Sequence, residues 1–140
     1  MDHLRLKSLR PASLCLGALG LVLALNLAAA PLLRCQVTYA GTTHTAQAHP
    51  VADPYAVPSV AIGGRFLFKP VVVGTAQRID YIKLYTYLDA SRQPVLIHVA
   101  KYLPPFRRSN RPYPLTGVQH LYAGPVEREL NYSCTLEGVT

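Results

Sequence analysis

The chain has 140 residues, of which 50% are hydrophobic, and it carries a formal net charge of +7 at pH 7. This length suits one domain with a modest core and excludes two domains. The basic excess favours anionic partners: nucleic acid in the cytoplasm, or lipid headgroups, acidic polysaccharide and acidic proteins outside it.

Residues 1–34 have the pattern of an export signal or an N-terminal membrane anchor. Arg5, Lys7 and Arg10 precede residues 12–33, which contain no Lys, Arg, Asp or Glu and include the sequence AAA near their end. Such a pattern is typical of a signal peptide, and about 18 or more apolar residues can also span a bilayer. The leader is therefore either removed or retained as an anchor. Positive charge before the apolar run predicts that everything after it lies outside the cytoplasm, in the periplasm or anchored to the inner membrane.

Residues 35–140 form the second predicted unit, a single β domain. Residues with strong β preference alternate there in short runs that Pro and Gly interrupt, and no helical pattern follows the leader. The clearest run, 78–88, should form a hairpin with 95–102. The predicted strands are 36–40, 43–48, 60–62, 65–69 with its extension 71–73 beyond Pro70, 78–88, 95–102, 118–122 and 127–136.

The number of runs predicts an all-β fold. Some seven or eight short strands favour a small β-sandwich of Ig-like type, and a small barrel is the alternative. The chain contains no Trp, so the Cys-Trp-Cys core of true Ig domains is absent. The proline-rich segments 49–59 and 103–115 are expected to be extended surface loops.

Two of the three cysteines lie outside the leader, and we expect them to form a disulfide. Cys35 and Cys134 each point with the apolar side of an alternating strand, where a buried bridge between the first and last strands would lie. A free thiol or a metal site is the competing interpretation. Two single cysteines without Cys-x-x-Cys spacing make a poor zinc site.

No motif predicts an enzyme. Glu127 and Glu129 share one strand face, but Arg128 lies between them and the alternation places them in solvent. The serines occur in no Gly-x-Ser-x-Gly context. His44 and His49 point to opposite faces of a regular strand, so neither a metal nor a cofactor is predicted.

Two basic or aromatic groups of residues are candidates for binding. The face of 78–88 that carries three tyrosines is either packed structure or a platform for sugar rings. The proline-rich segment is either a solvated loop or a docking loop for an anion or a protein. By alternation, the tyrosine face comprises Ile79, Tyr81, Tyr85 and Tyr87. The candidate binding loop comprises Lys101, Tyr102, Phe106, Arg107, Arg108, Arg111 and Tyr113.

These observations predict a non-catalytic binding or accessory protein of the cell envelope. Its partner would be an envelope protein or an anionic glycan or lipid surface; the N-terminal segment would contact the membrane, and no nucleic acid is expected. A carbohydrate-binding module that uses the tyrosine face is the alternative. A small hydrolase is the least favoured hypothesis.

Overall fold

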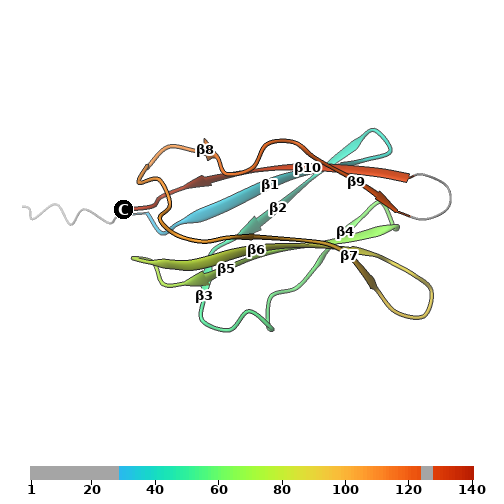
Figure 1. The fold of residues 1–140 in the computed structure, drawn as a ribbon, viewed down its shortest axis with the longest axis horizontal. Coiled ribbons are helices and arrows are strands. Elements are labelled where there is room, and N and C mark those ends of the chain that lie inside the picture. Colours follow the sequence, from blue (N-terminus) through green and yellow to red (C-terminus); the bar gives the residue numbers. More distant parts are fainter. Residues whose placement is uncertain (1–28, 124–127) are drawn as a thin grey trace, which may run out of the picture.

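The computed structural model describes residues 29–123 and 128–140, which form ten strands arranged in two sheets (Figure 1). The predicted export or anchor segment lies almost entirely outside these residues. Within them there is no helix of the length and hydropathy needed to span a bilayer. The strands are β1 Leu32–Tyr39, β2 Thr42–Ala48, β3 Pro50–Val51, β4 Val60–Ile62, β5 Phe66–Gly74, β6 Ile79–Leu88, β7 Val95–Tyr102, β8 Tyr113–Pro114, β9 Gln119–Ala123 and β10 Arg128–Glu137.

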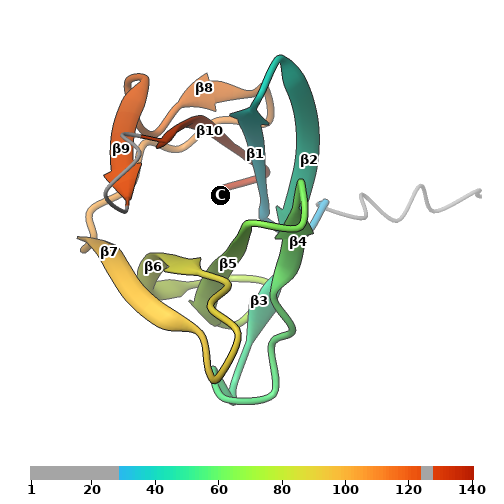
Figure 2. The same cartoon turned by 90° about the vertical axis from the view of Figure 1, so that its right-hand side faces the viewer.

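The first sheet has the order β2-β1-β10-β8, and β9 pairs with another part of β10. The second sheet has the order β3-β5-β6-β7, and β4 pairs with β5. All pairings between these strands are antiparallel except that of β3 with β5. The two sheets lie across from each other in Figure 2, so the all-β prediction is confirmed and the architecture is consistent with a β-sandwich.

Alternation along the strands accounts for the core. In β10 every second side chain from Leu130 is buried, because a strand places successive side chains on opposite faces. The same period in β1, β5 and β6 directs apolar side chains into the space between the sheets. The most deeply buried include Leu33, Val37, Phe66, Phe68, Ile82, Leu84, Leu130, Tyr132 and Leu136.

The predicted disulfide is present between Cys35 and Cys134. The two residues lie directly opposite each other on β1 and β10, with their Cα atoms 4.0 Å apart. Both are almost fully buried. The bridge therefore joins two neighbouring strands of one sheet and fixes the ends of a segment with a sequence separation of 99 residues.

Two β-bulges alter the alternation that the sequence predicts. The register shifts between Val73 and Gly74, so that Ile79 joins the core instead of sharing the face of the tyrosines. A second shift follows Thr86, and there Ile97 packs against the core while Val99 is 42% exposed. An extra residue in one strand reverses which face the following side chains occupy, and simple alternation cannot anticipate it.

The two proline-rich segments are more structured than predicted, which explains why ten strands form where seven or eight were expected. Pro50 and Val51 form β3 beside β5. Tyr113 and Pro114 form β8 beside β10. An isolated bridge between Ser109 and Val139 also holds the second segment. The domain boundary predicted at residue 34 falls inside the first strand, since β1 begins at Leu32.

Candidate functional site

The predicted binding loop surrounds a hollow at the end of β7. Five of its seven candidate residues line a cavity of about 370 Å³, and Arg108 and Arg111 do not. Arg107 lies over the ring of Tyr113, with Cζ 5.6 Å from the ring centroid. The lining residues from the predicted set are Lys101, Tyr102, Phe106, Arg107 and Tyr113.

This loop is anchored by its apolar side chains, while its arginines remain exposed. Phe106 and Tyr113 are partly buried and pack against the core. Burial raises the pKa of Tyr113, and its hydroxyl has no hydrogen-bond partner among the described residues. The segment is therefore not a free loop throughout, because its aromatic residues pack against the core while its arginines are exposed.

The predicted tyrosine face exists on the outer side of the second sheet. Tyr81, Tyr85 and Tyr87 alternate with the buried side chains of β6 and are partly exposed. The rings of Tyr85 and Tyr87 are nearly parallel, with centroids 6.2 Å apart and planes inclined by 17°. Burial, and then the neighbouring Tyr85, raises the pKa of Tyr87.

Lysines lie among these rings and were not part of the sequence prediction. Lys83 belongs to the same face, and its Nζ is 5.5 Å from the centroid of Tyr81 and 5.8 Å from that of Tyr85. Lys69 on β5 pairs with Tyr85. The term tyrosine–lysine face is used below for Lys69, Tyr81, Lys83, Tyr85, Tyr87 and Lys101.

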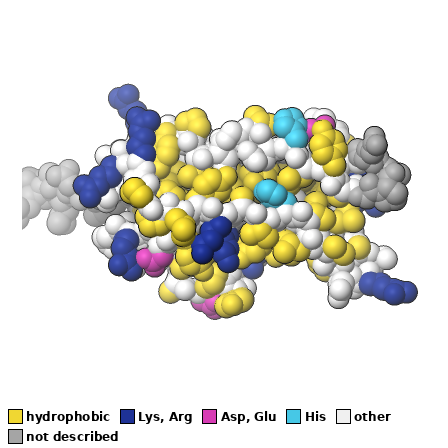
Figure 3. Space-filling model, viewed as in Figure 1, with side chains coloured by type: hydrophobic (Ala, Val, Ile, Leu, Met, Phe, Trp, Pro, Cys, Tyr) yellow, Lys and Arg dark blue, Asp and Glu magenta, His cyan; other side chains and the backbone are white. Residues whose placement is uncertain are grey.

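Lys101 connects this face to the loop. It lies opposite Lys83 in the pairing of β6 with β7, and its Nζ is 5.3 Å from the centroid of the Tyr81 ring. The same residue lines the hollow of the loop. The two candidate sites therefore form one continuous surface. A dark-blue patch among yellow side chains over β6 and β7 is visible in Figure 3.

A groove runs over the tyrosine–lysine face. It has a volume of about 270 Å³, and Pro54 and Tyr55 form its wall on the side of the segment between β3 and β4. Tyr55 is 91% exposed. The backbone N–H of Tyr55 donates a hydrogen bond of 2.9 Å to Asp53 Oδ1, which holds the turn that presents this ring. The folding of this segment onto the sheet could not be read from the sequence.

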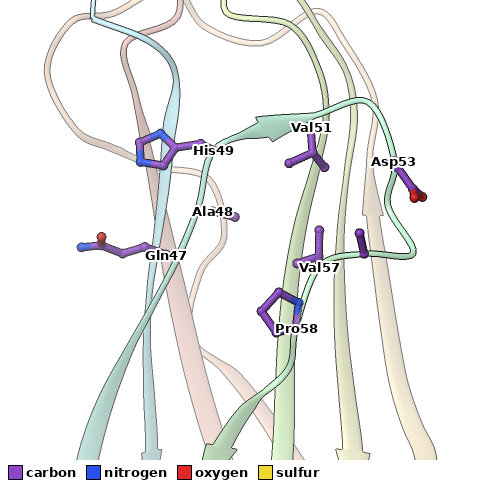
Figure 4. A pocket seen from close by; sticks show the side chains of 8 residues that line it. Gln47, Ala48, His49, Val51, Asp53, Val57 and Pro58 are labelled. Atoms are coloured by element: carbon purple, nitrogen blue, oxygen red, sulfur yellow. The ribbon is translucent and has the colours of Figure 1, made fainter.

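A second hollow, of about 400 Å³, lies between β2, β3 and the same segment. Figure 4 shows Val51 and Val57 leaning into this space, while Gln47, His49 and Asp53 point away from it. The wall is therefore mainly aliphatic. No acid, base and nucleophile converge there.

Residues with catalytic or metal-binding chemistry are dispersed in the described ranges. No group of three or more His, Cys, Asp or Glu side chains is close enough there to hold a metal ion. His120 Nδ1 contacts Glu129 Oε1 on the surface of the first sheet. Glu127, which shares a predicted strand face with Glu129, lies outside the described residues.

Comparison of the chain with protein-family models, with curated proteins and with solved structures found no match. The functional argument therefore depends on the side chains described above.

Proposed function

We propose that this chain is a non-catalytic binding or accessory protein of the cell envelope. The observation that carries the proposal is the position of Lys101, which joins the basic loop and the tyrosine–lysine face into one surface. Guanidinium and ammonium groups recognise carboxylate and phosphate, and aromatic rings supply contact area at interfaces. An anionic partner, either an envelope protein or a glycan or lipid surface, fits this combination.

The localisation proposed for the protein is outside the cytoplasm. It is supported by Arg5, Lys7 and Arg10 ahead of the uncharged residues 12–33. A disulfide between Cys35 and Cys134 agrees with an oxidising compartment. In this proposal the leader is either removed or kept as an N-terminal helix in the membrane.

An Ig-like topology is the finer fold proposal. Two facing sheets and central first and last strands support it. The bridge within one sheet departs from the Ig pattern, in which the disulfide joins the two sheets.

The test of the binding proposal is charge reversal in the loop. Arg107, Arg108 and Arg111 are exposed, so replacing all three by Glu should hardly change the melting temperature, because exposed ion pairs are worth about 0–1 kcal/mol. In the envelope fraction, cross-linking to the unaltered chain should capture partner proteins or glycans. The same cross-linking to the triple variant should not capture them. Capture by the unaltered chain should weaken as salt rises from about 50 to 300 mM, because salt screens charge.

A matched control reverses three arginines that lie away from the loop. Arg34, Arg65 and Arg92 are also exposed, and their replacement by Glu changes the net charge by the same amount. Capture should survive in this control. Equal capture of the partner by both triple variants would mean that the loop is a solvated surface without a binding role.

The stacked pair Tyr85 and Tyr87 favours carbohydrate binding as the second candidate function. Two nearly parallel rings on a rigid strand offer a platform to the apolar face of a sugar. A carbohydrate-binding module would retain glycans without turnover, whereas a hydrolase would release products.

A further inference from the structure

We propose that the tyrosine–lysine face is a binding site for an acidic polysaccharide. A sugar ring would lie against Tyr85 and Tyr87, and its carboxylate would be held by Lys83 and Lys101. This inference rests on the proposed binding function and names its ligand class.

The charge arrangement favours a bound anion. Lys83 and Lys101 are directly opposite on neighbouring strands, and like charges in that position destabilise a sheet. Tyr81 offsets part of this cost, since both ammonium groups lie within 5.5 Å of its ring centroid. The ion pairs in the described part of the chain are Arg78–Asp80 and His120–Glu129, so no carboxylate there pairs with these lysines.

The shape of the face favours a flat, partly apolar ligand. Beside the lysines, Val71 lies opposite Lys83 and is 1% exposed, so the floor of the face is apolar. Tyr85 and Tyr87 project from the same face of β6 beside it, with nearly parallel ring planes. Pyranose rings present C–H groups on one side and charged or hydroxyl groups at the rim, which matches rings bordered by lysines.

The shape of the groove favours a polysaccharide over a membrane surface as the ligand. The three tyrosines of β6 are partly buried, and Pro54 and Tyr55 form a wall beside them. A flat bilayer would reach the protruding Tyr55 but not the rings in the groove. A linear polymer can lie in the groove and continue past Lys101 toward Arg107, since Lys101 also lines the hollow of the binding loop.

The ligand experiment measures, by isothermal titration calorimetry, the binding of three polymers and of vesicles containing anionic phospholipid to the full chain. Polygalacturonate combines sugar rings with carboxylates, its fully methyl-esterified form keeps the rings without the charge, and polyglutamate keeps the charge without the rings. We expect binding of polygalacturonate that is at least about tenfold tighter than binding of either other polymer, a difference of about 1.4 kcal/mol. Equal or tighter binding of polyglutamate would overturn the proposal, as would binding of vesicles containing anionic phospholipid that is lost when Lys83 and Lys101 are replaced by Gln.

Two variants separate the roles of charge and ring. Replacing Lys83 and Lys101 by Gln should weaken polygalacturonate binding by about tenfold or more while leaving the melting temperature equal or higher, because the opposed charges are gone. Tyr85→Leu should weaken it by a similar factor, since Leu keeps the apolar bulk but loses the ring face. The matched controls, Arg34→Gln and Tyr122→Leu on the other sheet, should bind normally.

The outcomes also separate this inference from the broader function. If polygalacturonate fails to bind while the loop variant still loses its envelope partner, the acidic-polysaccharide site is wrong and the binding function stands. If the Gln variant and the Arg34 control bind polygalacturonate equally, the site is wrong as well.

Discussion

The half-buried side chain of His98 forms a polar pair with Tyr132, which belongs to the apolar core. The distance from His98 Nε2 to the Tyr132 hydroxyl is 3.0 Å, and Tyr132 is 1% exposed. Thr86, opposite His98 on β6, is fully buried, and its Oγ1 has no hydrogen-bond partner in the described residues. Burial lowers the pKa of His98 and raises that of Tyr132, so both groups are held neutral.

The lowered pKa of His98 predicts that acid destabilises the fold. The unfolded chain takes up the proton near pH 6.5, whereas the folded chain takes it up only at lower pH. His98 therefore leaves the free energy of unfolding unchanged above about pH 6.5, where it is neutral in both states. Below that pH the free energy of unfolding falls, because the unfolded chain binds the proton more readily than the folded chain. As the pH is lowered from about 7.5 to about 5, the melting temperature of the unaltered chain should drop. In His98→Gln the drop should be smaller, because Gln does not titrate. An equal drop in both proteins would contradict this.

The Cys35–Cys134 bridge should contribute strongly to stability because it limits the unfolded chain. In the chain-entropy model, closing a loop of about 100 residues raises the free energy of unfolding by about 4–5 kcal/mol. Replacing both cysteines by Ala should lower the melting temperature by about 10 °C or more. Thiol titration of the unfolded, unreduced full chain should detect one of the three cysteines, Cys15, which lies outside the described residues. Detecting three would contradict the bridge.

At the scale of the element, the β-bulge between β5 and β6 determines what the second sheet presents on each side. Gly74 has φ 150°, and an added Cβ would overlap the carbonyl oxygen of Arg78 and lie 2.9 Å from Ile79 Cα. The close approach of the two strands here turns Ile79 inward and Tyr81 outward. The tyrosine–lysine face therefore depends on this glycine.

Gly74→Ala should destabilise the domain by about 2 kcal/mol or more, since it forces both a backbone strain and a steric overlap. Denaturant unfolding would measure the change. Gly117→Ala is the matched control, because a Cβ at Gly117 would meet no atom within 4 Å. If Gly117→Ala lowers the free energy of unfolding as much as Gly74→Ala does, the bulge geometry is not the cause of the destabilisation.

At the scale of the whole molecule, the proposed topology places Thr140 outside the cytoplasm. A phosphatase fused after Thr140 should be active in the complete chain and inactive when residues 1–28 are deleted, because the reporter works only after export. Mass spectrometry of the N-terminus should find either an intact chain or a start no later than Leu32, where β1 begins. An active cytoplasmic reporter at the same position, with a silent phosphatase, would contradict export.

The sequence by itself determined much of the fold, because local alternation decides which side chains can be buried. It predicted the long strands, the β6–β7 hairpin and the buried Cys35–Cys134 bridge between the first and last strands, since a strand has a strict period of two. It also identified the tyrosines of β6 as one face.

The tertiary structure decided how these pieces combine. Two bulges turn Ile79 into the core and Ile97 against it, and the positions of these bulges depend on pairing with a neighbouring strand. The placement of Lys101 beside both Tyr81 and the basic loop, and of Tyr55 beside the groove, arises from contacts between segments distant in sequence. Alternation carries no information about such contacts, because strand register and loop packing are set by the whole sheet.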